Sequence, residues 1–162
     1  MIHKISYCSV YKFNELTPDR DARVISILDH YSKVPRPDFR GYGPVLKLSF
    51  KDRCEEEYGL GHYWPDEVDD TLNDFYLGTR HETVFTKPMA QTIVNFFEWN
   101  HNYTWNDKSS LIVHCRAGVS RSSTIAYYLG DCYGIPVENL GNRKPRSNPR
   151  ILRMFDKTYR QL

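Results

Sequence analysis

The alternation of apolar and polar positions divides the chain into strand-like and helix-like segments. Short apolar runs that are rich in β-branched residues, as is typical of strands, occur four times. They cover residues 2–10, 23–28, 45–50 and 110–114. The run at 2–10 also contains polar residues, so we expect it at a sheet edge, whereas the run at 23–28 is typical of a buried strand.

Helical patterns fall between and after these runs. Thr17-Pro18-Asp19 has the order of N-cap, proline and first-turn acid, and predicts a short helix before the strand at 23–28. Thr86 and Asn148-Pro149 are further expected helix starts, and a helix is predicted at 122–133. The apolar residues of the two capped helices recur at roughly helical spacing. They are Met89, Ile93, Val94, Phe96 and Phe97 in the first, and Ile151, Leu152, Phe155 and Tyr159 in the second.

Residues 53–85 interrupt this alternation. They are polar, acidic and aromatic with little periodicity, and we interpret them as an insertion with a short helix around 66–76. The remaining order of strands and helices predicts one α/β layered domain over residues 1–162, with a central, mostly parallel sheet flanked by helices. The ligand site of such a fold is expected at the carboxyl ends of the strands.

Composition and charge narrow the function classes. The net charge of +2 gives no general reason to expect nucleic acid or membrane as a partner, and no apolar run is long enough to span a bilayer. The 4 cysteines show neither Cys-x-x-Cys pairing nor metal-ligand spacing, so we expect no metal or other cofactor. The N-terminus lacks the apolar region of a signal peptide, and we expect a cytoplasmic monomer with free thiols.

Residues 114–122, His-Cys-Arg-Ala-Gly-Val-Ser-Arg-Ser, carry the clearest chemistry in the chain. A strand would deliver Cys115 to a turn that Gly118 allows to be tight, and a helix would begin near Ser122. The backbone N–H groups of such a loop and the helix N-terminus suit a tetrahedral oxyanion. The planar fork of Arg121 matches two phosphate oxygens, and this environment favours ionisation of Cys115 into a nucleophilic thiolate.

This segment resembles the His-Cys-x5-Arg-Ser/Thr signature of the cysteine-dependent protein tyrosine phosphatases, and the element order from about Val24 onward resembles their small dual-specificity-like branch. The resemblance implies the same α/β architecture and a phosphocysteine intermediate. It further implies that Ser122 helps the thiolate to leave and that His114 supports the loop from behind. The residues that would hold the substrate phosphate are Arg116, Ala117, Gly118, Val119, Ser120 and Arg121.

The general acid has two main candidates. Asp52 directly follows the predicted strand at 45–50, as the acid loop does in dual-specificity phosphatases, and is our preferred candidate. Asp66 belongs to Trp64-Pro65-Asp66, the tripeptide of the larger tyrosine-specific members, but no convincing strand precedes it. A different acid remains a third alternative, because both separations from Cys115 exceed the usual family spacing.

The expected function is hydrolysis of phosphotyrosine, and also of phosphoserine or phosphothreonine, in a phosphorylated protein substrate. The loop lacks the lysines of phosphoinositide-directed members, since Arg116, Ala117, Val119 and Ser120 occupy its variable positions. Two alternatives stay open at this point. One is a phosphate-binding module that recognises phosphorylated partners without turnover, and the other is a phosphatase for RNA or a small phosphorylated metabolite.

Overall fold

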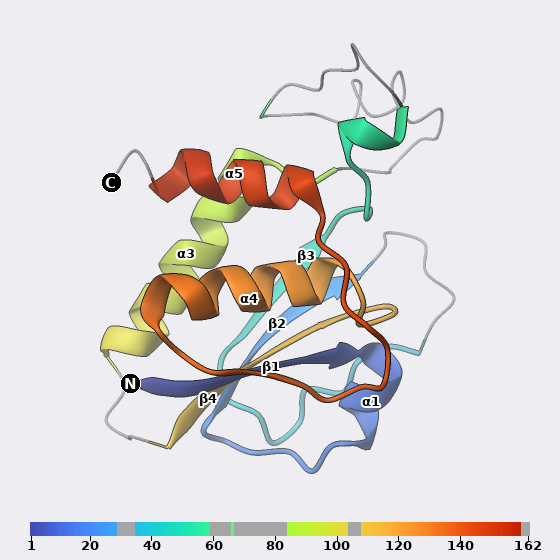
Figure 1. Cartoon of the computed structure of the whole chain (residues 1–162). Helices are drawn as coiled ribbons and strands as arrows, with labels where there is room; N and C mark the ends of the chain where they lie inside the picture. Colours follow the sequence, from blue (N-terminus) through green and yellow to red (C-terminus); the bar gives the residue numbers. More distant parts are fainter. Residues whose placement is uncertain (29–34, 59–65, 67–83, 104–107, 160–162) are drawn as a thin grey trace.

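A five-stranded parallel sheet forms the centre of the protein (Figure 1). The computed structural model describes residues 1–28, 35–58, 66, 84–103 and 108–159. The strands follow the spatial order β3-β2-β4-β1-β5, so β4 is central. Their bounds are Ile2–Ser9 for β1, Ala22–Leu28 for β2, Val45–Ser49 for β3, Ser109–Cys115 for β4 and Val137–Asn139 for β5. This architecture confirms the single-domain α/β fold class.

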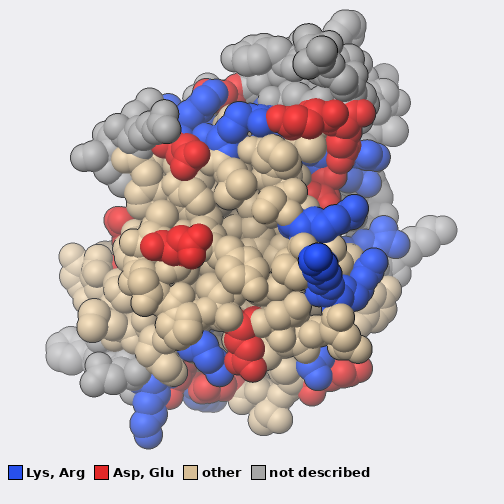
Figure 2. Space-filling model, viewed as in Figure 1, with Lys and Arg blue, Asp and Glu red and all other residues tan. Residues whose placement is uncertain are grey.

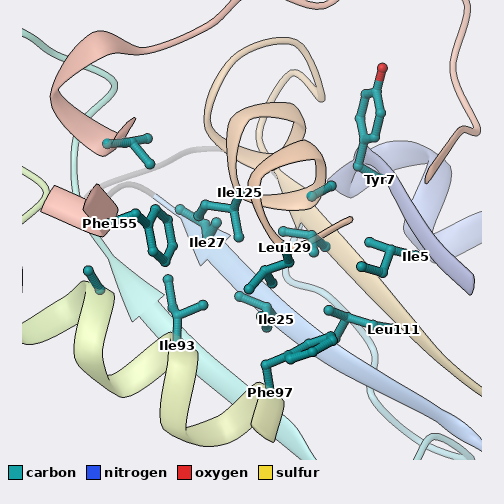
Figure 3. Close-up of a cluster of buried hydrophobic side chains, with 14 of the residues drawn as sticks. Ile5, Tyr7, Ile25, Ile27, Ile93, Phe97, Leu111, Ile125, Leu129 and Phe155 are labelled. Atoms are coloured by element: carbon teal, nitrogen blue, oxygen red, sulfur yellow. The ribbon is translucent and has the colours of Figure 1, made fainter. Parts of the chain in front are cut away.

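Helices cover the two faces of the sheet unequally. One face packs against α3 (Lys87–Asn102), α4 (Arg121–Tyr133) and α5 (Pro149–Tyr159) in a continuous apolar core (Figure 3). The other face carries a smaller cluster that includes Phe13 of α1 (Val10–Glu15) and Phe39 of the connection between β2 and β3. Alternate strand residues supply the two faces: Leu111 and Val113 belong to the large core, whereas Ile112 packs against the small cluster.

Two predicted helix starts are confirmed by their capping contacts. The Thr86 hydroxyl accepts a hydrogen bond from the backbone N–H of Met89 at 3.3 Å and begins α3. The Asn148 side-chain oxygen accepts from the N–H groups of Arg150 and Ile151 at 3.0 and 3.2 Å and begins α5. Both contacts satisfy backbone donors that have no partner within the helix.

Three local predictions were wrong or incomplete. β1 is not at the sheet edge, because it pairs with β4 on one side and with the short strand β5, which the pattern did not indicate, on the other. The first helix begins directly after β1, where the Ser9 hydroxyl accepts from the N–H of Lys12. Asp19 instead closes a turn before β2, with its carboxylate accepting from the N–H of Asp21 at 2.8 Å.

The insertion is described only at its ends. A short 3₁₀ helix, η1 (Glu55–Tyr58), follows the β3 strand, and residue 66 and residues 84–86 lead into α3. The short helix expected around 66–76 lies almost entirely outside the described residues. Among the described helices, none combines the length and apolarity that crossing a bilayer requires.

Candidate active site

The loop between β4 and α4 lies at the carboxyl end of the central strand. β4 ends at Cys115 and α4 begins at Arg121, as the sequence pattern predicted to within one residue. Gly118 has φ of +69°, and a β-carbon at this position would meet the backbone of Ser9 and lie only 2.6 Å from the carbonyl carbon of Cys8. Glycine is therefore required here both for the left-handed conformation and for the close packing of the loop on the end of β1.

Cys115 lies at the base of this loop with only 2% of its surface exposed. Its sulfur accepts a hydrogen bond from the backbone N–H of Gly118 at 3.2 Å. The sulfur also lies 3.1 Å from the hydroxyl oxygen of Ser122, which is fully buried in the first turn of α4. A thiolate at this position would be stabilised by both donors and by the N-terminus of α4.

Arg121 connects the loop to the end of β3. The residue is 5% exposed, and its Nη1 donates to the backbone carbonyl oxygen of Phe50 at 2.8 Å. Phe50 is separated from Asp52 by a single residue. This contact therefore brings residues 50–53, which we call the acid-bearing segment, beside residues 114–122, which we call the phosphate loop. The sequence pattern did not indicate this carbonyl as an anchor for the arginine.

Asp52 is brought directly to the phosphate loop. The carboxylate oxygen Oδ1 accepts from the hydroxyl of Ser120 at 2.9 Å and from the side-chain amide of Asn148 at 2.8 Å. Asp66 makes different contacts: its carboxylate pairs with Lys157 of α5 at 2.7 Å. The backbone carbonyl oxygen of Asp66 accepts a hydrogen bond from the N–H of Lys87 at 2.9 Å. The structure therefore brings Asp52, and not Asp66, to the loop, while Trp64 and Pro65 lie outside the described residues.

His114 is buried on the face of β4 that is opposite to Cys115. Its ring stacks on Phe13 with centroids 4.7 Å apart, and burial lowers the pKa of the imidazole to about 4, although a contact with the Cys115 backbone opposes this shift. The ring is therefore neutral at neutral pH and packs behind the loop, as expected for a structural support. Cys8 pairs in register with His114, and burial, with a smaller contribution from the Cys115 charge, raises the pKa of its thiol to about 12.

The predicted phosphate-binding residues divide into a buried and an exposed group. Gly118, Val119 and Ser120 are buried, whereas Arg116 and Ala117 are exposed at the rim of the loop. Among the described residues, no group of three or more His, Cys, Asp or Glu side chains is arranged to hold a metal ion. The described groups that converge on the loop are the Cys115 thiol, the Arg121 guanidinium, the Asp52 carboxylate and backbone N–H groups.

Comparisons with protein families, curated proteins and solved structures return no match to this chain. The assignment of the site consequently depends on the contacts described above.

Asn148 is a site residue that the sequence pattern identified only as a helix cap. Its amide nitrogen donates to Asp52 and, at 3.2 Å, to the carbonyl oxygen of Arg53. Its backbone N–H donates to the hydroxyl of Thr124 on α4 at 2.9 Å. The Asn148 side chain thus links the acid-bearing segment to the start of α5, and the Asn148 backbone links the start of α5 to α4. We regard Asn148 as a positioning residue for Asp52.

Asn148→Ala is expected to reduce both stability and kcat. Loss of the α5 cap should cost about 1 kcal/mol of unfolding free energy. Loss of the amide donor should let Asp52 move and lower kcat by about tenfold to a hundredfold. Asn148→Ser separates the two effects, because serine caps a helix about equally well but has no amide group to donate to Asp52. Urea unfolding and phosphopeptide turnover measure the two quantities.

The matched control is Thr86→Ala, which removes the cap of α3 at a position outside this hydrogen-bond network. It should lower the unfolding free energy by about the same 1 kcal/mol and leave kcat unchanged. If kcat falls equally in the Thr86 and Asn148 variants, or stays unchanged in Asn148→Ser, the positioning role is wrong.

Proposed function

We propose that this protein is a phosphatase that hydrolyses phosphotyrosine, and also phosphoserine or phosphothreonine, in phosphorylated proteins. The observation that carries the proposal is the position of the Cys115 sulfur, within hydrogen-bond distance of both the Gly118 N–H and the Ser122 hydroxyl at the start of α4. Such a site suits a thiolate nucleophile and a bound phosphate dianion. A catalytic thiolate needs a reducing compartment, and we therefore place the activity in the cytosol.

The proposed reaction has two displacement steps at phosphorus. The Cys115 thiolate attacks the phosphorus atom, the bond to the ester oxygen breaks, and the protonated Asp52 carboxyl gives its proton to the leaving oxygen. Arg121 and the loop N–H groups stabilise the charge on the three equatorial oxygens. Water then attacks the phosphocysteine while the Asp52 carboxylate accepts its proton. Inorganic phosphate and the thiolate are released, and the Ser122 hydroxyl stabilises the sulfur as its bond breaks.

A direct assay tests this function. We expect the purified protein to hydrolyse an aryl phosphate and a phosphotyrosine peptide in the presence of a metal chelator, with inhibition by vanadate. Vanadate adopts the trigonal bipyramidal geometry of the transition state and should occupy the loop. Tight phosphopeptide binding without turnover would contradict the proposal in favour of a phosphate-binding module. Turnover of only RNA or a small phosphorylated metabolite would contradict the assigned substrate class.

Asp52→Asn should lower kcat on a phosphotyrosine peptide by about a hundredfold or more. The amide oxygen can still accept from Ser120 and Asn148, so the fold is expected to stay intact while the proton donor is lost. The decrease should be smaller for an aryl phosphate with a good leaving group, because its departing oxygen needs less protonation. Steady-state kinetics with both substrates measure the difference.

Asp66→Asn is the matched control for this prediction. It weakens an exposed ion pair with Lys157, which is worth little, and should leave kcat within about twofold of the wild type. A larger loss of kcat in Asp66→Asn than in Asp52→Asn would show that Asp66, and not Asp52, is the general acid.

A further inference from the structure

Two grooves border the phosphate loop on opposite sides and carry different charges. The first, of about 290 Å³, lies between the loop and α1 and is lined by Ala117 and Gly118. Its cations are Lys12 from α1 and Arg143 from the connection between β5 and α5. A substrate whose phosphate is held above Cys115 would therefore place one of its flanking groups beside two positive charges.

The second groove, of about 150 Å³, borders the other side of the loop. Its wall includes Asp52 and Glu57 together with Ser120, and one cation, Arg146. Figure 2 shows the same contrast on the surface: basic side chains gather along the connection between β5 and α5, and acidic side chains lie above them, over the region of η1 in Figure 1. Glu57 in this wall is paired with Arg53 at 3.3 Å, so the charges of this flank are largely compensated, whereas the flank beside α1 is basic.

The cations of the first groove are available for a ligand. Within the described part of the chain, no acidic group lies at ion-pair distance from Lys12, Arg116 or Arg143. By contrast, Arg153 and Lys157 of α5 are paired with acidic residues. Unpaired cations at the rim of an anion site attract acidic substrate groups and add to affinity without entering the chemical step.

We propose that this charge asymmetry selects phosphopeptides that carry an acidic residue on one side of the phosphorylated residue. The acidic side chain lies in the groove between Lys12 and Arg143, and the exposed ring of Tyr11 packs along the same groove. A neutral residue occupies the opposite flank, where Glu57 is already paired with Arg53. This inference rests on the proposed phosphatase function and adds a substrate preference to it.

A peptide fits this arrangement better than a polyphosphorylated small molecule or RNA. A ligand with phosphates on several sides would place negative charge beside Glu57 on one flank as well as in the basic groove on the other. A peptide can present an acid on one flank only. The one contrary charge in the basic groove is the exposed carboxylate of Glu15, which provides a further test.

The experiment compares three phosphotyrosine peptides with the same centre: one with acidic residues before the phosphotyrosine, one with them after it, and one neutral. We expect the wild type to prefer one acidic peptide over the other by about fivefold in kcat/KM, as solvated charge pairs contribute modestly. The preference should disappear at about 0.5 M salt, because the charges are exposed to solvent. The ratio between peptides cancels any change in the chemical step.

Charge reversal assigns the preference to the groove. Lys12→Glu combined with Arg143→Glu should abolish or invert the ratio, and a peptide with lysine on the preferred flank should then become the better substrate. Glu15→Gln should increase the ratio. The control is Lys4→Glu combined with Lys108→Glu, an equal change in net charge at the amino-terminal edge of the sheet, which should leave the ratio unchanged.

These experiments distinguish failure of the substrate preference from failure of the proposed phosphatase function. If the wild type hydrolyses all three peptides equally, or if the groove variants keep the wild-type ratio, this inference is wrong and the phosphatase function stands. A preference for inositol polyphosphate or RNA over all three peptides would also overturn it. If neither the peptides nor an aryl phosphate is hydrolysed, the proposed function itself fails.

Discussion

Cys115→Ser is expected to abolish phosphate-ester hydrolysis while leaving the protein folded. Serine is nearly isosteric, and its hydroxyl can still accept from the Gly118 N–H and lie beside Ser122. A serine hydroxyl is not ionised at neutral pH, and His114 faces the other side of β4, where it cannot take the hydroxyl proton. We expect kcat to fall by a factor on the order of 10⁴ or more.

The same variant should retain phosphopeptide binding, because Arg121 and the loop N–H groups are unchanged. Calorimetric titration with a phosphotyrosine peptide measures the binding, and single-turnover kinetics measure the loss of phosphocysteine formation. Cys132→Ser is the matched control, because this cysteine is exposed on α4 and should not affect turnover. Hydrolysis at an undiminished rate by Cys115→Ser would contradict the phosphocysteine mechanism.

The part of the site that could be predicted from the sequence is the part built from neighbouring residues. The apolar run before Cys115, the glycine at 118 and the arginine at 121 form one continuous segment, and strand, turn and helix each have local signals there. The structure places all three where the pattern indicated. The fold class could be predicted from the sequence for the same reason, since alternating strand and helix patterns indicate a parallel sheet.

The contacts that complete the site join residues far apart in the chain. Asn148 reaches Asp52 across 96 positions and Arg121 reaches the Phe50 carbonyl across 71, and neither contact leaves a local pattern. Arg150 is a similar case: a fully buried cation on α5 that donates to the carbonyl oxygen of Phe85 at 2.7 Å, although charged residues are seldom found in a core. The contacts of Asn148 and Arg150 depend on how α5 packs against α3 and α4.

The first helix shows how two equivalent local signals compete. Ser9 and Thr17 are both suitable N-caps, but only Thr17 is followed by Pro18 and Asp19, and the start at Ser9 was not predicted. In the structure Ser9 caps the helix, which places Phe13 on the ring of His114 behind the phosphate loop. The packing of Phe13 in the small core decides between the two starts, and capping preference alone does not contain that information.

Arg121→Lys is expected to lower kcat by about a hundredfold to a thousandfold without unfolding the protein. Arginine presents its donors in a planar fork, so that one edge can hold the Phe50 carbonyl while other donors face two phosphate oxygens. Lysine keeps the positive charge but has a single ammonium group on a flexible chain. It cannot satisfy Phe50 and bind two oxygens in the geometry that the trigonal bipyramidal transition state requires.

The test separates charge from geometry. Arg121→Lys should weaken vanadate inhibition together with kcat, because both depend on stabilising the trigonal bipyramid, while circular dichroism and urea unfolding remain close to the wild type. Arg40→Lys is the control, since Arg40 is exposed and paired with Asp38 outside the loop. If Arg121→Lys retains wild-type kcat, a point charge is sufficient at this position. The fixed fork between Phe50 and the substrate would then not be the source of transition-state stabilisation.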